Sequence, residues 1–286
     1  MSALALSLIV MSAFMHATWN YLAKRSAGGF AFVWLYMSVS TVIFAPFVIG
    51  LFFLQSISFG WMELAFIAGS ALIHVVYALM LQKGYKIGDF SLVYPVARGI
   101  GPAIVAISAV FLFHETLSLI SIIGIILIIG SIFVISGGLQ AIRGADTLFP
   151  LLYGLMIGCL IAAYTLLDKA AVGFALMPPL LLNYGTIVGQ VLMLTPKALR
   201  NVDQVKSDWK EHRKEAIGIG ILNPLAYILV LTAMTFTQVS HVAPVRELSI
   251  LIGTVMGAKM LSEGLGYRRI VAAATMVLGI IVITLS

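Results

Sequence analysis

Two short stretches place a proline and an arginine close together inside long apolar runs: Tyr94-Pro95-Val96-Ala97-Arg98 and Ala243-Pro244-Val245-Arg246-Glu247. Each surrounding run is long enough to cross a bilayer, which takes about 20 apolar residues. An ionised side chain at that depth is costly, and it is found lining a watered cavity or beside a partner. The two arginines therefore mark a candidate site, and their matching positions indicate that the chain contains two copies of one unit.

The composition of the 286-residue chain is typical of an integral membrane protein. Hydrophobic residues make up 61% and charged residues 10% of the sequence, against roughly 25% charged residues in an ordinary soluble domain. Hydropathy windows predict an all-α membrane protein with ten spanning helices. The predicted spans are residues 3–23, 29–53, 61–82, 90–113, 117–137, 148–168, 174–195, 215–236, 238–261 and 267–285.

The basic residues orient these predicted helices. If the connections alternate sides, all 17 lysines and arginines fall on one face except Lys169 and the two arginines within spans. Because cytoplasmic connections carry the basic excess, this face is predicted to be cytoplasmic and both termini extracytoplasmic. The polar segment 197–215 on that face is interpreted as a solvated loop. Topology and lipid headgroups thus explain the net charge of +6, and no nucleic acid partner is expected.

Residues 1–140 and 146–286 are predicted to be repeats of one five-helix unit. Offsets of 149 and then 148 residues match Ser91, Pro95, Arg98 and Glu115 with Ser240, Pro244, Arg246 and Glu263. Five helices per copy is an odd number, so the second copy must enter the membrane from the opposite side. Inverted repeats around a central cavity suit transport by alternating access.

A recurring pattern connects the chain to a known family. In each half, Pro-Val is followed by a long apolar stretch that ends in Glu, from Pro95 to Glu115 and from Pro244 to Glu263. With the two halves and the ten helices, this pattern resembles the EamA family of the drug/metabolite transporter superfamily. The resemblance implies a basket of helices around a cavity and transport of small metabolites, often export of amino acids.

A finer resemblance rests on three stretches. Residues 16–20, 94–99 and 244–247 are similar to a subgroup of that family associated with phosphonate utilisation. We expect the protein in the bacterial inner membrane, as a multi-pass protein whose oligomeric state is left open.

Arg98, Arg246 and Glu247 are the main candidate substrate ligands. Arg98 lies about eight residues, or roughly 12 Å, into its predicted span, and Arg246 is equally deep from the other side. A guanidinium group is a permanent charge with a planar fork suited to carboxylate, phosphonate or phosphate. Glu247, the only acidic residue deep in a predicted span, could balance charge, bind an ammonium group or carry a coupling proton. The alternative is a structural Arg–Glu pair that locks two helices.

The charge of this candidate site narrows the substrate. Two arginines and one ionised glutamate sum to +1, which favours a small anionic or zwitterionic metabolite. We therefore expect a secondary transporter, an exporter, with no cofactor or metal and with the proton as a candidate coupling ion. A flippase for a phosphate-headed lipid carrier is the alternative. An enzyme is not expected, because the sequence has no zinc-protease, nucleophile-elbow or phosphate-loop motif.

Polar residues of two further spans are candidate cavity lining. His74 shares a helix face with Tyr77, and its repeat counterpart Asn223 shares a face with Tyr227. Two polar pairs at equivalent depth would suit a substrate cavity. Ordinary hydrogen bonding between helices is the alternative for both pairs.

The first span and its repeat counterpart add more candidates. His16 and Asn20 share a face of the first span, with Trp19 beside them, and Tyr164 is the repeat counterpart of Trp19. Tyr94, in the first Pro-Arg stretch, completes the set of candidate substrate-binding residues. Alternatively, Trp19 and Tyr164 are aromatic residues at the membrane interface.

Three kinds of residue are predicted to shape the helices. Pro95, Pro224 and Pro244 should kink their spans or make their starts irregular. Glu115 and Glu263, at helix ends, are interpreted as caps or interface residues rather than substrate ligands. Small residues are predicted to allow close contact between helices: Gly99, Gly101, Gly124, Gly130, Gly253, Gly257 and Gly279.

Overall fold

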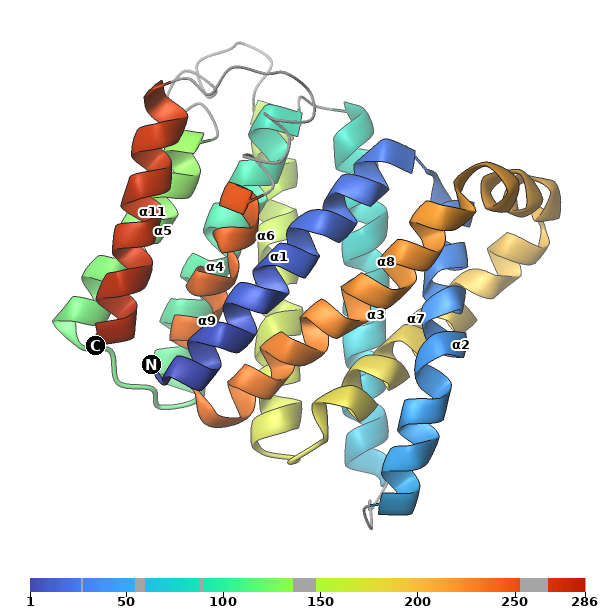
Figure 1. Ribbon diagram of the computed structural model, residues 1–286, viewed down its shortest axis with the longest axis horizontal. Helices are drawn as coiled ribbons and strands as arrows, with labels where there is room; N and C mark the ends of the chain where they lie inside the picture. Colours follow the sequence, from blue (N-terminus) through green and yellow to red (C-terminus); the bar gives the residue numbers. More distant parts are fainter. Residues whose placement is uncertain (27, 55–59, 88–89, 136–147, 253–266, 286) are drawn as a thin grey trace.

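In the computed structural model, the chain is a bundle of α-helices (Figure 1). The structure describes residues 1–26, 28–54, 60–87, 90–135, 148–252 and 267–285. The helices are α1 (Ala3–Ser26), α2 (Phe30–Leu54), α3 (Trp61–Ile87), α4 (Phe90–Leu112), α5 (Leu119–Ile135), α6 (Leu148–Gly173), α7 (Pro179–Leu199), α8 (Val202–Phe236), α9 (Val239–Arg246) and α11 (Tyr267–Leu285). These ranges contain no strand, which confirms the all-α prediction.

Several helices are long and apolar enough to cross a bilayer. Within the described ranges, the candidate spans are Ala3–Ala23, Phe30–Leu54, Trp61–Leu81, Leu152–Gly173 and Val202–Phe236. Large apolar side chains on these helices face outward, as a lipid environment allows. The multi-pass membrane character is therefore confirmed, whereas the count of ten spans and their orientation stay predictions.

The helix pairs that pack most closely are far apart in sequence. α1 packs against α8, α4 against α6, and α5 against α11, while α2 and α3 both contact α7. Figure 1 shows α5 and α11 together at one edge of the bundle and α2 and α7 toward the other. α1, α4, α6, α8 and α9 lie between these edges, and they carry most of the candidate site.

Glycine allows a close helix approach at the contact of α5 and α11. A Cβ atom on Gly124 would lie 2.9 Å from the carbonyl oxygen of Gly279, and a Cβ atom on Gly279 would lie 2.9 Å from that of Gly124. Gly101 on α4 similarly faces Ile161 on α6. The predicted role in helix contact is confirmed at these three glycines and wrong at Gly130, where an added Cβ would meet nothing within 4 Å.

Three of the glycines named in that prediction remain untested. Gly253 and Gly257 lie outside the described residues, and Gly99 is described only as part of α4.

The polar segment 197–215 is helical for most of its length, so its interpretation as a loop was wrong. α8 begins at Val202, and its backbone leaves helical geometry only at His212 (φ −126°, ψ 25°), where two helical parts meet. Figure 1 shows the first part turned away from the rest of α8. Residues 202–215 contain neither glycine nor proline, and side-chain pairs four residues apart, such as Gln204 with Asp208, stabilise such a surface helix.

The helix that carries the second Pro-Arg stretch is broken at Glu247. α9 ends at Arg246, Glu247 forms a turn, and helical structure resumes over residues 248–252. The Glu247 N–H donates to the carbonyl oxygen of Pro244 at 3.0 Å, a tighter pattern than that of an α-helix. The irregularity predicted near Pro244 is confirmed, whereas in α8 the non-helical residue is His212 rather than Pro224. Pro95 is described only as part of α4.

Candidate functional site

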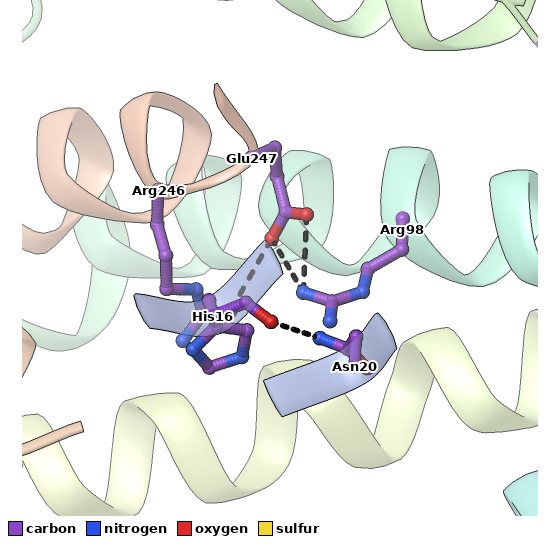
Figure 2. Close-up of polar contacts among 5 residues, drawn as sticks. All are labelled: His16, Asn20, Arg98, Arg246 and Glu247. Carbon is purple, nitrogen blue, oxygen red and sulfur yellow. Dashed lines mark hydrogen bonds and ion pairs between the residues drawn. The ribbon is translucent and has the colours of Figure 1, made fainter. Parts of the chain in front are cut away.

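Both intramembrane arginines meet one carboxylate. Arg98 Nη1 donates to Glu247 Oε2 at 3.1 Å and to Oε1 at 3.3 Å, and Arg246 Nη2 lies 3.5 Å from Oε1. All three side chains are buried, and that of Glu247 has no exposed area. Figure 2 shows the two guanidinium groups on either side of the carboxylate. The site therefore joins α4 of the first half of the chain to α9 of the second.

The break after α9 explains how two neighbouring residues reach the same point. In a continuous α-helix, successive side chains point about 100° apart. The turn at Glu247 (φ −70°, ψ −3°) changes that relation and leaves the carboxylate between the guanidinium groups of Arg98 and Arg246. Backbone outside the regular helix is tolerated at membrane depth where protein buries it, and this turn is fully buried.

Arg246 has hydrogen-bonding capacity that its ion pair does not use. Its Nε and Nη2 atoms are buried and have no hydrogen-bond partner in the described part of the chain, although the residue is only 1% exposed. Buried polar groups are nearly always hydrogen-bonded, so such donors require an explanation. A bound anionic group would explain these donors, because a guanidinium fork matches carboxylate and phosphonate oxygens.

α1 adds a histidine to this charge cluster. The buried ring of His16 interacts electrostatically with both Arg98 and Arg246, and Figure 2 shows it beside the Arg246 side chain. Asn20 Nδ2 donates to the main-chain oxygen of His16 at 2.7 Å, so its amide is engaged within its own helix. The Trp19 ring lies edge-on to His16, with 5.1 Å between centroids. The structure thus brings His16 to the arginine pair, whereas Asn20 bonds within α1 and Trp19 packs against His16.

A second group of predicted residues forms an aromatic cluster between α3, α6 and α8. The centroids of His74 and Tyr164 are 4.1 Å apart, and Tyr227 lies 5.7 Å from His74 and 6.2 Å from Tyr164. Tyr77 joins at 5.6 Å from Tyr164. Tyr164 is 7% exposed, so its alternative interpretation as an interfacial aromatic was wrong. Trp19 is half-buried and packs beside Phe32.

The remaining predicted residues are less tightly held. His74 Nδ1 lies 2.9 Å from the carbonyl oxygen of Ser70, within its own helix, rather than bonding to a neighbouring helix. Asn223 is half-buried on α8, and its side chain makes no hydrogen bond to another described residue. Tyr94 is part of α4, and its side chain lies outside the described ones.

Asp168 is a buried acidic residue that the sequence interpretation missed. It is 1% exposed, and the Tyr227 hydroxyl donates to its Oδ2 atom at 2.5 Å. The prediction that Glu247 is the only deep acidic residue was therefore wrong. The error came from ending the sixth span at residue 168, because α6 continues to Gly173. The signal that could have revealed it was the uncharged stretch 170–173 after Lys169, which let the helix continue past the aspartate.

Lys169, the basic residue on the opposite face, has a structural role. Its Nζ atom donates to the main-chain oxygens of Met234 at 2.7 Å and Thr237 at 3.2 Å. These carbonyl groups lie at the end of α8, where a helix leaves acceptors without partners. Lys169 therefore caps the end of α8.

Glu115 caps the beginning of α9 from the connection between α4 and α5. Its Oε1 atom accepts from the Val239 N–H at 2.8 Å, and its Oε2 atom accepts from the Ser240 N–H at 3.1 Å and hydroxyl at 2.5 Å. The interpretation as a cap is confirmed, although the carboxylate is buried rather than near water. Glu263 lies outside the described residues.

A buried polar stripe on α7 was also missed. Its members recur three and four residues apart, which places them on one helix face; they are Asn183, Thr186 and Gln190. Such a pattern inside an apolar span was a readable signal. Among the described residues, no group of three or more His, Cys, Asp or Glu side chains could hold a metal ion.

Comparisons with known proteins agree with this architecture. Residues 148–285 match the EamA-like transporter family. A solved crystal structure of a protein superposes with a TM-score of 0.75 at 16% identity, over 98% of this chain and 98% of that chain. At this identity the likeness shows the fold alone. No curated protein matches the sequence.

Proposed function

We propose a specific activity for this chain, which is a membrane transporter of the drug/metabolite type. The proposal proceeds from the EamA-like transporter match over residues 148–285. The protein is a secondary transporter that moves a small anionic or zwitterionic metabolite across the cytoplasmic membrane, in the direction of export. Amino acids and phosphonates are the substrate classes that fit. Arg98 and Arg246 hold the acid group, and Glu247 positions the two guanidinium groups.

The observation that carries this proposal is the incomplete pairing of Arg246. Three buried charges sum to +1, and two donor atoms of Arg246 have no hydrogen-bond partner among the described residues. A purely structural Arg–Glu pair would leave one guanidinium group uncompensated at a cost of several kcal/mol. An anionic substrate group supplies both the missing charge and the missing acceptors.

The packing of the helices supports alternating access. On the repeat plan, α1 to α4 correspond in order to α6 to α9. The contact of α1 with α8 then has its counterpart in the contact of α6 with α3. The contact of α2 with α8 likewise has its counterpart in the contact of α7 with α3. Such paired contacts are expected of two inverted repeats, residues 1–140 and 146–286. We propose ten spanning helices on this plan, around a central cavity, with both termini extracytoplasmic.

Uptake into proteoliposomes tests the proposed function. Four radiolabelled compounds cover the substrate classes: L-alanine, L-glutamate, 2-aminoethylphosphonate and glucose 6-phosphate. We expect transport of at least one, and we expect Arg246→Ala to reduce it about 10- to 100-fold, because a hydrogen bond to a charged group contributes about 1.5–3 kcal/mol.

Arg25→Ala is the matched control. Arg25 also pairs with a glutamate, Glu215 at 3.6 Å, but its side chain is 64% exposed, so we expect unchanged transport. Equal transport by Arg246→Ala and the wild type would contradict the proposal. Movement of a phosphate-headed lipid, with none of the four soluble compounds transported, would favour a flippase instead.

A further inference from the structure

The Asp168 carboxyl group is buried without a cationic hydrogen-bond partner among the described residues. The residue is 1% exposed, its Oδ2 atom accepts from Tyr227, and its Oδ1 atom has no hydrogen-bond partner in the same part of the chain. The neighbouring Lys169 is directed to the end of α8 instead. An isolated carboxylate is costly to bury, and taking up a proton removes that cost.

The groups around Asp168 come from several packed helices. His74 on α3, Tyr227 on α8 and Arg246 on α9 interact electrostatically with the carboxyl group, and Ser70 on α3 also lies close to it. α4 directs its Arg98 to Glu247, and the buried polar side chains of α7 are uncharged. Arg246 is therefore the charged group shared between Asp168 and the arginine pair.

Glu247 is a poorer proton carrier than Asp168. Two guanidinium groups lie within 3.5 Å of its carboxylate, which they neutralise without a proton. Protonation of Glu247 would leave both arginines buried and uncompensated, whereas protonation of Asp168 removes a charge that forms no ion pair among the described residues. The two buried carboxyl groups thus differ in what a proton does to the energy of the site.

Aromatic rings beside Asp168 suit an ammonium group. The Tyr227 hydroxyl group contacts the carboxyl group directly. The rings of His74 and Tyr164 lie beside the Tyr227 ring, at centroid distances of 5.7 Å and 6.2 Å. A carboxylate with aromatic faces nearby attracts a cation by charge and by cation–π interaction. A zwitterionic substrate with its acid group on Arg246 would direct its amine toward this cluster.

We propose that Asp168 is the proton-binding residue of the transporter, and that it exchanges its proton for the ammonium group of a zwitterionic substrate. The inference rests on the proposed function and deepens it. Proton and ammonium compete for one carboxylate, so each can leave only when the other arrives. Protons moving into the cell would then drive a zwitterion out, and no covalent step is needed.

Infrared spectroscopy of the full-length protein in lipid vesicles tests proton binding without a substrate. A protonated carboxyl group gives a C=O stretching band distinct from that of a carboxylate. We expect this band near neutral pH in the wild type, its loss in Asp168→Asn, and its retention in Asp208→Asn, which changes another buried aspartate at the far end of α8. Absence of the band from the wild type, or its persistence in Asp168→Asn, would overturn the proposal.

Matched compounds test the exchange. L-Alanine and 2-aminoethylphosphonate are added separately, and at least one of them should remove the band. Propionate and ethylphosphonate, which lack the amine, should leave it in place. If neither amine-containing compound removes the band, the proposed exchange is overturned. If Asp168→Asn does not fold, Asp168→Glu should keep a protonated band and its sensitivity to the amines. Proton binding without uptake of any of the four compounds would reject the transport function and leave the proton site intact.

Discussion

At the scale of single residues, Glu247 allows two arginines to share the interior of a membrane protein. Its carboxylate accepts from Arg98 and pairs with Arg246, and all three side chains are nearly inaccessible. Burying a charge is tolerated when an opposite charge compensates it, and removing one partner leaves the other at full cost. The same residue is therefore important for stability whether or not a substrate is bound.

We expect Glu247→Gln to lower the free energy of unfolding by about 3–5 kcal/mol, the usual cost of breaking a buried ion pair. Thermal unfolding in detergent micelles would measure the effect. Glu63→Gln is the matched control, because among the described residues Glu63 accepts only from the exposed Gly60 N–H, at 2.8 Å. Similar unfolding temperatures for the two variants would show that the arginines do not depend on this carboxylate.

At the scale of helices, the contact of α5 with α11 depends on the absence of two side chains. We expect Gly124→Ala or Gly279→Ala to destabilise the protein by about 1–3 kcal/mol, because each new methyl group would press on the backbone of the partner helix. Gly130→Ala meets open space, so its helix propensity should leave stability unchanged or raise it by up to about 1 kcal/mol. Thermal unfolding of the three variants would rank them, and the reverse order would refute the close contact.

The beginning of α9 depends on a carboxylate from another part of the chain. Glu115→Ala removes three hydrogen bonds from Val239 and Ser240, so we expect a loss of about 0.5–2 kcal/mol and faster hydrogen exchange in the peptide that contains them. Glu63→Ala, which removes an exposed cap within one helix, should leave α9 unchanged. Unaltered exchange in Glu115→Ala would mean that α9 holds its first turn without this cap.

At the scale of the whole molecule, the distribution of basic residues predicts which face is cytoplasmic. In a Cys159→Ser background, Phe174→Cys should react with a membrane-impermeant maleimide added to intact cells, because Phe174 is 70% exposed in the connection after α6. Ser207→Cys, exposed in the polar part of α8, should react only after permeabilisation. Labelling in the opposite pattern would reverse the predicted orientation.

Sequence patterns identified the membrane class, the paired arginines and most residues that gather around them. Arg98, Arg246 and Glu247 were recognisable because a charge inside an apolar run is rare and costly. Asp168 escaped because its recognition depends on where α6 ends, and helix ends are the least reliable part of a hydropathy prediction. The helical start of α8 escaped because charged segments on a solvated surface can be either loop or helix.

Composition and charge spacing were enough to indicate an all-helical membrane protein with a cationic centre, because the cost of burying charge in lipid acts on every such residue whatever its neighbours. The three-dimensional packing decided which carboxylate pairs with the arginines and which forms no ion pair with any described residue. Glu247 and Asp168 are both acidic residues in apolar surroundings, but only the break after α9 places Glu247 between Arg98 and Arg246. Electrostatic interactions depend on distances of a few ångströms, and helix packing sets those distances.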